Sequence, residues 1–454
     1  MKAVHGKNYL PRQPHSAWGA LVRDFKQVRN VLIPTLLLLL LVGSTSVAFV
    51  MYTGLNSSNS APDVNVGVVF CGNTTAEANL LIDRVKSYTN LFIISAGYPS
   101  RNQTMLEEIC DYAVSKNLKV IINVGFNSTG PGYSRNWFWN STSIDDIKQR
   151  WTERWGNMFV GMYYNDEPGG IQLDGNWNNY FARLSSLVKN PLNYSSSFPS
   201  VYVDATHELY DIYLKMQKAN GSTPADYNAE AEFFVKNVIQ RDPGFSSLKK
   251  AGFTTFTSDY GLYWFDYLGG YDTLFAECGW NCSLTEQIDL VRGAAHMQNK
   301  EWGVIMTWKY NMAPYLDTGD QIYKQMMTSY KAGASYVVLF NYPILDGNDY
   351  GVMNNEHFDA LEKFWNDASK IKRTTANNAE AAFVMPRNYG WGMRQPTDRI
   401  CGFWGPDDKS IPIGTSLGKL LTQYGEHMDI VFDDAAYPVA NGGYTKIYYW
   451  NQTI

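Results

Sequence analysis

Residues 66–70 read VGVVF, residues 91–95 read LFIIS and residues 118–124 read LKVIINV. Each run is short, continuous and rich in Val and Ile, which is typical of strands buried on both faces of a sheet. Amphipathic stretches near 77–88 and 105–116 separate the three runs. Strands that alternate with helices at this spacing indicate βα units and a parallel sheet.

The same alternation continues along the chain. Five further apolar runs lie at 159–164, 253–258, 273–277, 303–308 and 336–341, with helical patterns near 143–155, 284–298, 320–332 and 356–372. Eight strands with helices between them, within residues 64–373, predict an α/β fold of the (β/α)8 barrel type. The long region 169–252 predicts an insertion after strand four. An open doubly wound sheet usually carries a Gly-rich phosphate loop, and the sequence contains none.

The pattern changes at the C-terminal end. Residues 374–382 are polar or small and predict a linker. Residues 383–454 predict a small accessory α/β domain, with strands at 383–385, 429–432 and 446–450 and a helix near 415–424.

The N-terminal region contains a candidate membrane anchor. Residues 31–52 carry no charge and are long enough to cross a bilayer as a helix. The tail 1–30 holds six Lys and Arg against one Asp, and the next basic residue after the apolar run is Arg84. The positive-inside rule therefore predicts a cytoplasmic tail, a stalk at 53–63 and an extracellular body. A cleaved signal peptide is the alternative, because Ser46-Val47-Ala48 is a small-x-small site. The long basic tail favours a retained anchor.

Two further patterns fit a body outside the cytoplasm. Asn-x-Ser/Thr sequons, the acceptors of N-glycosylation, occur at Asn56, Asn73, Asn102, Asn127, Asn140, Asn193, Asn220, Asn281 and Asn451. Among five cysteines, Cys278 and Cys282 are close enough to close a loop, and Cys71 with Cys110 is a second possible pair. Cys401 is then left over.

Composition and missing motifs exclude several classes of protein. The 454 residues carry a net charge of -5 with no basic block, so nucleic acid is not an expected partner. No His-x-His, HExxH, GxSxG or phosphate-binding loop occurs, so we expect no metal and no cofactor. Aromatic residues make up 15% of the chain, which suits a packed core and also flat ligands such as sugars.

The reactive groups of a (β/α)8 barrel lie at the C-terminal ends of its strands. Acids follow strand four at Asp166 and Glu167 and end strand six at Glu277, and these three are the candidate catalytic residues. Candidates for contact with substrate are Tyr164, Asp259, Tyr260, Trp264, Trp280, Trp308, Lys309, Asn341 and Tyr342. Carboxylates beside aromatic rings predict a carbohydrate as substrate or ligand.

Residues 161–168, GMYYNDEP, resemble the fourth-strand motif of TIM-barrel glycoside hydrolases. The Asp-Glu pair is similar to that of hexosaminidases that use substrate assistance. The resemblance implies that Glu167 is the general acid and that Asp166 orients the 2-acetamido group of the substrate, which acts as nucleophile. Strand seven ends in Thr307 and Trp308, where many barrel hydrolases have a nucleophilic Glu.

The sequence leaves the second carboxylate and the function with alternatives. If two protein carboxylates act, the partner of Glu167 is Glu277 or Asp259. The leading hypothesis is a membrane-anchored extracytoplasmic glycoside hydrolase, with a transglycosylase using the same site as a variant. The alternative is an inactive barrel that binds glycans or has a structural role at the cell surface, in which case Asp166, Glu167 and Pro168 only cap a helix.

Overall fold

The computed structural model describes residues 61–95, 97–123, 143–173, 226–279, 282–307, 309, 314–342, 347–371, 373, 379–390 and 406–454. The expected tail and anchor, and most of the expected stalk, lie outside these residues. Among the residues described, no helix is both long and apolar enough to cross a membrane. Residues Ala61–Ile454 form one compact unit.

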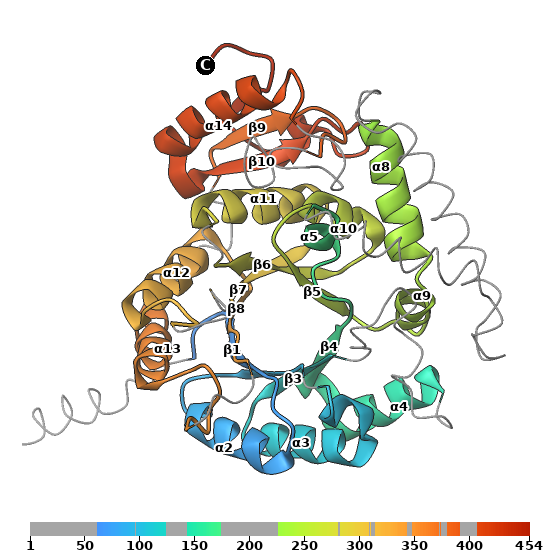
Figure 1. Cartoon of the computed structure of the whole chain (residues 1–454), viewed down its shortest axis with the longest axis vertical. Helices are drawn as coiled ribbons and strands as arrows, with labels where there is room; N and C mark the ends of the chain where they lie inside the picture. Colours follow the sequence, from blue (N-terminus) through green and yellow to red (C-terminus); the bar gives the residue numbers. More distant parts are fainter. Residues whose placement is uncertain are drawn as a thin grey trace, which may run out of the picture. The chain divides into compact units, whose positions relative to one another are not determined.

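Eight parallel strands close into a barrel, seen end-on as a ring in Figure 1. They are β1 (Asn65–Phe70), β2 (Leu91–Ile94), β3 (Lys119–Asn123), β4 (Phe159–Tyr163), β5 (Thr255–Asp259), β6 (Thr273–Cys278), β7 (Glu301–Met306) and β8 (Tyr336–Leu339). Strand β8 pairs with β1, which closes the ring. The predicted (β/α)8 barrel is confirmed, and each strand lies within a few residues of its predicted position.

Helices cover the outside of the ring (Figure 1). They are α2 (Thr75–Val85), α3 (Gln103–Ser115), α4 (Ile144–Trp155), α10 (Tyr263–Gly269), α11 (Leu284–Met297), α12 (Gly319–Ala332) and α13 (Asn355–Ala368). Polar N-caps begin most of them; Thr74 and Thr318 each form a capping box. Helix α10 was not predicted, because it has only seven residues and its N-cap is Leu262, which has no side-chain group to cap the helix.

The predicted insertion between β4 and β5 contains several short helices. They are α5 (Pro168–Leu173), α8 (Tyr227–Phe233), the π-helical segment η5 (Phe234–Gln240) and α9 (Pro243–Lys250). The helical patterns expected near 177–188 and 205–218 lie outside the described residues. Short 3-10 turns at η1 (Pro99–Arg101), η3 (Gly156–Met158), η6 (Gly425–His427) and η7 (Val439–Gly442) complete the list of elements.

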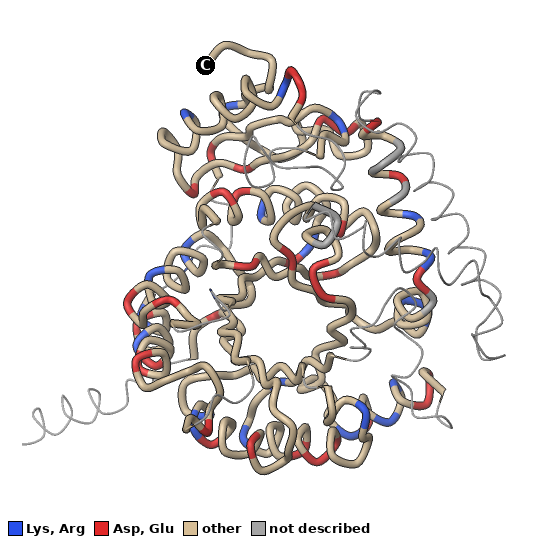
Figure 2. Tube along the Cα trace, viewed as in Figure 1, with Lys and Arg blue, Asp and Glu red and all other residues tan. Residues whose placement is uncertain are grey.

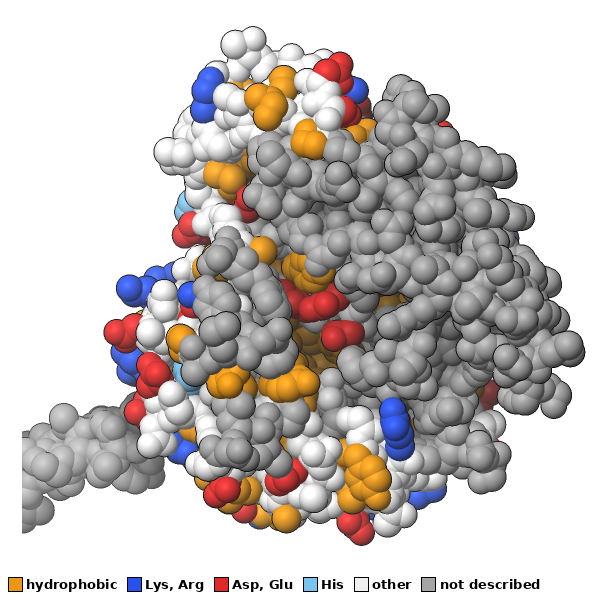
Figure 3. All heavy atoms as spheres, in the orientation of Figure 1, with side chains coloured by type: hydrophobic (Ala, Val, Ile, Leu, Met, Phe, Trp, Pro, Cys, Tyr) orange, Lys and Arg blue, Asp and Glu red, His pale blue; other side chains and the backbone are white. Residues whose placement is uncertain are grey.

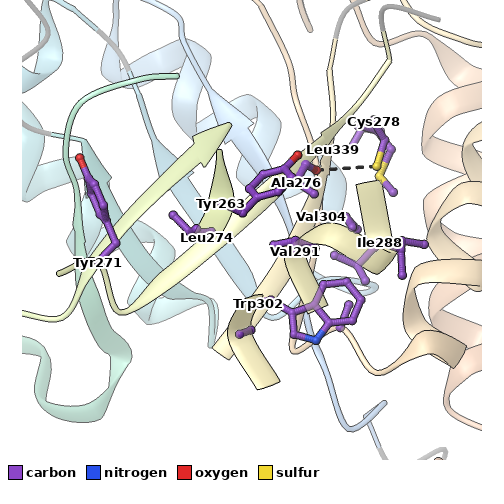
Figure 4. Packing of buried hydrophobic residues seen from close by; sticks show 14 of the residues in the cluster. Tyr263, Tyr271, Leu274, Ala276, Cys278, Ile288, Val291, Trp302, Val304 and Leu339 are labelled. Carbon is purple, nitrogen blue, oxygen red and sulfur yellow. Dashed lines mark hydrogen bonds between the residues drawn. The ribbon is translucent and has the colours of Figure 1, made fainter. Parts of the chain in front are cut away.

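The barrel wall separates two apolar cores. The inner core contains Val69, Leu91, Ile93, Ile121, Tyr163, Phe256, Phe275, Ile305, Tyr336 and Val338. The outer core lies between strands and helices, where Leu274 and Val304 meet Ile288 and Val291 of α11 (Figure 4). Because side chains alternate along a strand, inward Phe256 and Phe275 place Ser258 and Glu277 on the inside as well, one layer nearer the mouth.

The two cores also explain the state of the cysteines. Cys110 belongs to the outer core, whereas Cys71 packs against the inner one. Both thiols are free, as is that of Cys278. The disulfides considered from the sequence, Cys71 with Cys110 and Cys278 with Cys282, are therefore not formed. The first pair is separated by the barrel wall.

The predicted C-terminal α/β domain is present. Strands β9 (Ala381–Met385), β10 (Met428–Phe432) and β11 (Lys446–Tyr449) form a parallel sheet of order β10-β9-β11, which packs with α14 (Ser410–Tyr424). The sheet lies against α11 (Figure 1). Gly293 permits this approach, since a Cβ there would lie 2.5 Å from the carbonyl oxygen of Ile430.

A buried ion cluster joins the domain to the barrel. Arg292 of α11 contacts Asp429 of β10 at 2.6 Å and Asp289 at 3.2 Å. It also donates to the carbonyl oxygen of Met428 at 2.7 Å. All three charged side chains are at most 3% exposed.

We predict that Arg292→Ala destabilises this unit by about 3–5 kcal/mol, because it leaves the two buried aspartates without their cation. Urea unfolding checks this, with Arg387→Ala on the exposed surface as the matched control. Equal midpoints for the two variants would contradict the assignment of Arg292 as the central contact of this interface.

Candidate active site

The connection that follows β4 has an uncommon backbone conformation. Asn165 and Glu167 have φ angles of 56° and 50°, in the left-handed region that residues other than glycine seldom adopt. Neighbouring strand β5 fixes this conformation. Thr257 Oγ1 donates to the carbonyl oxygen of Asn165 at 2.5 Å, and the N–H of Glu167 donates to the carbonyl oxygen of Ser258 at 3.1 Å. Strain held in this way is concentrated at functional sites.

Two hydroxyl groups link Asp166 to Glu277 at the mouth of the barrel. Tyr163 Oη donates to Asp166 Oδ1 and lies 2.7 Å from Ser258 Oγ. Ser258 Oγ is in turn hydrogen-bonded to Glu277 Oε1 at 2.6 Å. The direct contact between Ser258 Oγ and Asp166 Oδ1 is longer, at 3.4 Å. Acidic positions gather beside β5 and β6 at the rim (Figure 2), and acidic side chains are visible inside a hollow of the surface (Figure 3).

Each of the two acids accepts a hydrogen bond from one of these hydroxyls. Tyr163 Oη donates to Asp166 Oδ1, and Ser258 Oγ donates to Glu277 Oε1. The backbone N–H of Ser258 donates to Tyr163 Oη at 3.0 Å. The hydroxyls therefore fix the positions of both carboxyl groups relative to each other.

Burial and charge act differently on the two carboxyl groups. Burial raises the pKa of Glu277 well above its ordinary value, and the charges of Glu167 and Asp166 raise it further. Burial also raises the pKa of Asp166, but hydrogen bonds from Tyr163 and Ser258 oppose the shift. The side chain of Glu277 is 3% exposed, and its Oε2 has no partner among the described residues. A carboxyl in such a place favours its neutral form.

The predicted catalytic residues are thus brought together. Asp166 and Glu277 share one hydrogen-bonded chain, and Glu167 is near enough for its charge to act on Glu277. Two members of the chain, Tyr163 and Ser258, were not predicted as site residues. The period-two pattern of the strands contained the signal, because both lie on the same face as the acids.

Three of the residues predicted to contact substrate instead make structural contacts. Tyr164 is 1% exposed and donates to Asp242 Oδ1 at 2.6 Å. Trp264 is 2% exposed, and its ring packs 5.5 Å from that of Phe432 in the C-terminal domain. Asn341 Oδ1 accepts the N–H of Val352 at 3.1 Å. These contacts hold the fold together around the site.

The remaining candidates have varied surroundings. Lys309 forms an ion pair with Asp317 at 2.8 Å. Tyr342 is 41% exposed and lines a surface pocket with Phe70 and Tyr350. The ring of Tyr260 packs against Gly170, and Asp259 is fully buried beneath the turn that carries Glu167. Trp280 and Trp308 lie outside the described residues.

One further polar group lies at the end of β7. Thr307 is 9% exposed, and its Oγ1 has no partner among the described residues. Gly279 leaves it room, since a Cβ there would lie 2.7 Å from Thr307 Oγ1. No three His, Cys, Asp or Glu side chains in the described part of the chain are grouped to hold a metal ion.

No protein-family model matches the chain and no curated protein matches it significantly. Among solved structures, a GH5_18 protein of Streptomyces cattleya in complex with GlcNAc is 11% identical and has a TM-score of 0.44; the match covers 86% of this chain and 99% of that one. Alpha-L-fucosidase isoenzyme 2 of Paenibacillus thiaminolyticus is 10% identical with a TM-score of 0.43, over 81% and 58%. The 3-dehydroquinate dehydratase of Aquifex aeolicus is 10% identical with a TM-score of 0.27, over 66% and 98%. Overlaps this loose carry no argument about activity or substrate.

We predict that Glu277→Gln makes the stability of the protein less dependent on pH. A carboxyl whose folded pKa is raised stabilises the fold fully at low pH, and this contribution is lost as the pH rises toward the folded pKa. The carboxamide mimics the protonated acid at every pH, so the slope becomes shallower by up to about 1.4 kcal/mol per pH unit. Urea unfolding between pH 5 and 8 measures it, with exposed Glu153→Gln as control. An unchanged slope in Glu277→Gln would show that Glu277 is ionised in the fold.

Proposed function

We propose that this chain is a glycoside hydrolase that cleaves amino-sugar-containing glycans outside the cytoplasm. The observation that supports it is the carboxyl cluster at the ends of β4 and β6, in which hydroxyl groups link Asp166 to Glu277 and burial raises the pKa of Glu277 well above its ordinary value. Hydrolysis of a glycosidic bond needs an acid for the leaving oxygen and a negative group beside the developing positive charge. Glu167 and Asp166 fill these two roles in the proposal.

The reaction proceeds in two steps. Glu167 gives its proton to the glycosidic oxygen while the carbonyl oxygen of the substrate's own 2-acetamido group attacks the anomeric carbon. The glycosidic bond breaks, the leaving sugar departs and an oxazolinium ion forms. Glu167, now a carboxylate, then takes a proton from water, whose oxygen attacks the anomeric carbon and reopens the ring.

Asp166 orients the acetamido group in this scheme. Its carboxylate accepts the acetamido N–H and stabilises the positive charge of the oxazolinium ion. The hydrogen bonds that described residues donate to Asp166 both go to Oδ1, an arrangement in which Oδ2 serves the substrate. The burial of Glu277 favours its neutral form and argues against the alternative in which Glu277 is the nucleophile, because a nucleophilic carboxyl must be ionised.

The location of the enzyme is part of the proposal. Residues 31–52 would hold the barrel on a short stalk, so that it reaches glycans near the membrane surface. Replacement of residues 1–52 by a cleavable signal peptide should release active protein into the medium. A mature N-terminus immediately after Ala48 in the full chain would instead show a cleaved signal peptide.

We predict that Glu167→Gln lowers kcat for chito-oligosaccharides by about 100- to 10,000-fold with little change in binding, since it removes the general acid and keeps the side-chain shape. Mass spectrometry of the products measures hydrolysis, and Glu362→Gln on the exposed face of α13 is the control. An inactive glycan-binding barrel would show binding without hydrolysis in the parent protein on any glycan tested.

We also predict that a GlcNAc-derived thiazoline protects the parent thermally and that Asp166→Ala abolishes this protection. A ligand at about 100 times its Kd adds about 2.7 kcal/mol to the free energy of unfolding. If substrates that lack the acetamido group are cleaved equally fast, substrate assistance is excluded and pairing of Glu167 with Glu277 takes its place.

A further inference from the structure

A second carboxyl pair lies beneath the turn that carries Glu167. Asp259 ends β5, Asp266 belongs to α10, and both side chains are 0% exposed. Three backbone N–H groups donate to Asp259: those of Gly169 to Oδ2 at 2.5 Å, and of Gly170 and Tyr260 to Oδ1 at 2.7 Å each. A carboxyl that accepts three N–H donors is stabilised as an anion.

Asp266 has the opposite surroundings. Neither of its oxygens receives a hydrogen bond from a donor in the described residues, and its side-chain neighbour is the carboxyl of Asp259. Two carboxylates can only accept, so this contact is a hydrogen bond only when one of them carries a proton. A buried carboxyl without donors favours its neutral form, which places the proton on Asp266, directed at Asp259.

The pair acts on the backbone at the start of α5. Helix α5 begins at Pro168, directly after Glu167. The packing there is close: a Cβ on Gly169 would lie 2.9 Å from Asp259 Oδ2 and 2.7 Å from the carbonyl oxygen of Gly261. The backbone is therefore fixed on both sides of the Glu167 side chain, whose residue has a φ of 50°. Its own N–H is bonded to β5, and the N–H groups of the two following glycines are bonded to Asp259.

We propose that Asp259 and Asp266 share a single proton and act as positioning residues that hold Glu167 in its working orientation. The role of Glu167 as acid rests on the proposed function, whereas the shared proton and the hold on residues 168–170 do not. The pair also limits the pH range over which the turn is ordered, because loss of the shared proton puts two negative charges in contact in a buried place.

The groups that face the pair do not relieve that repulsion. They are Glu277 from β6 and the phenols of Tyr263, Tyr267 and Tyr271, whose pKa values burial raises well above the ordinary value. No cation of the described residues is among the groups that shift either carboxyl. Burial raises the pKa of Asp266, the carboxyl that holds the proton, well above its ordinary value, and the charge of Asp259 raises it further. Because the folded pKa lies above the unfolded one, the stabilising contribution is complete near pH 4 and is lost as the pH rises toward the folded pKa.

Hydrogen–deuterium exchange of the peptide that contains Gly169 and Gly170 tests the proposal without any substrate. In the parent, protection corrected for intrinsic exchange should fall at least tenfold between pH 6 and 9, which corresponds to about 1.4 kcal/mol. Asp266→Asn supplies a permanent N–H donor and should keep protection constant over this range. Asp259→Asn removes one acceptor and should lose protection at every pH. Asp289→Asn changes a buried aspartate of α11 that contacts Arg292, and it should behave like the parent.

Kinetics provide the second readout. Asp259→Asn should lower kcat on chito-oligosaccharides about 100-fold with KM little changed, and Asp266→Asn should extend the alkaline limb of the kcat profile. Equal, pH-independent protection in the parent and Asp266→Asn would overturn the shared proton. The expected exchange pattern in a protein that hydrolyses no glycan would leave the positioning pair standing and reject the proposed function.

Discussion

Carboxyl groups inside a barrel lose much of the water that stabilises their charge, and two of them in contact cannot both ionise at little cost. Two sets of buried carboxyl groups illustrate this constraint: Asp166 and Glu277, which are linked through two hydroxyls, and Asp259 and Asp266. In the second pair Asp259 accepts three backbone N–H groups, whereas neither oxygen of Asp266 has a partner among the described residues. The surroundings thus favour the anion on one acid and the proton on the other, as in other sites where two acids have different tasks.

The geometry of parallel strands produces these pairs. Along β5 and β6, alternate residues face the inner core, so Ser258 and Glu277 meet Tyr163 inside the barrel. Asp259 is the next residue after Ser258 and faces outward, where it meets α10 and the start of α5. Ser258 and Asp259, two consecutive residues of β5, therefore belong to the two carboxyl clusters, and the turn that carries Glu167 lies between these clusters.

Much of the fold follows from sequence patterns, whereas the site does so only in part. Short, continuous apolar runs at βα spacing predicted all eight strands, and the first runs are rich in Val and Ile because strands buried on both faces favour these residues. Helix α10 was missed, since seven mostly aromatic residues carry no helical period. The cluster of Asp166, Glu167 and Glu277 followed from the rule that reactive groups end barrel strands. The structural contacts of Trp264 and Asn341 could not be predicted in this way, because packing against another domain or a loop leaves no local sequence pattern.

The protonation states were also beyond reach of the sequence. They depend on which donors approach each carboxyl, and the donors here come from residues up to 95 positions away, as in the contact of Tyr163 with Ser258. The surroundings of Thr307 could not be predicted either. The sequence shows only that Thr stands where many barrel hydrolases have a Glu, whereas the structure shows a buried hydroxyl at the end of β7.

The central claim is that Asp166 and Glu167 act together on one amino sugar at the barrel mouth. A crystal structure of the Glu167→Gln variant with a bound chito-oligosaccharide tests it most directly. We expect that the carboxamide at position 167 contacts the glycosidic oxygen and that the acetamido N–H donates to Asp166, with the acetamido carbonyl oxygen beneath the anomeric carbon. A sugar bound away from these side chains, or an acetamido group turned toward solvent, would contradict it.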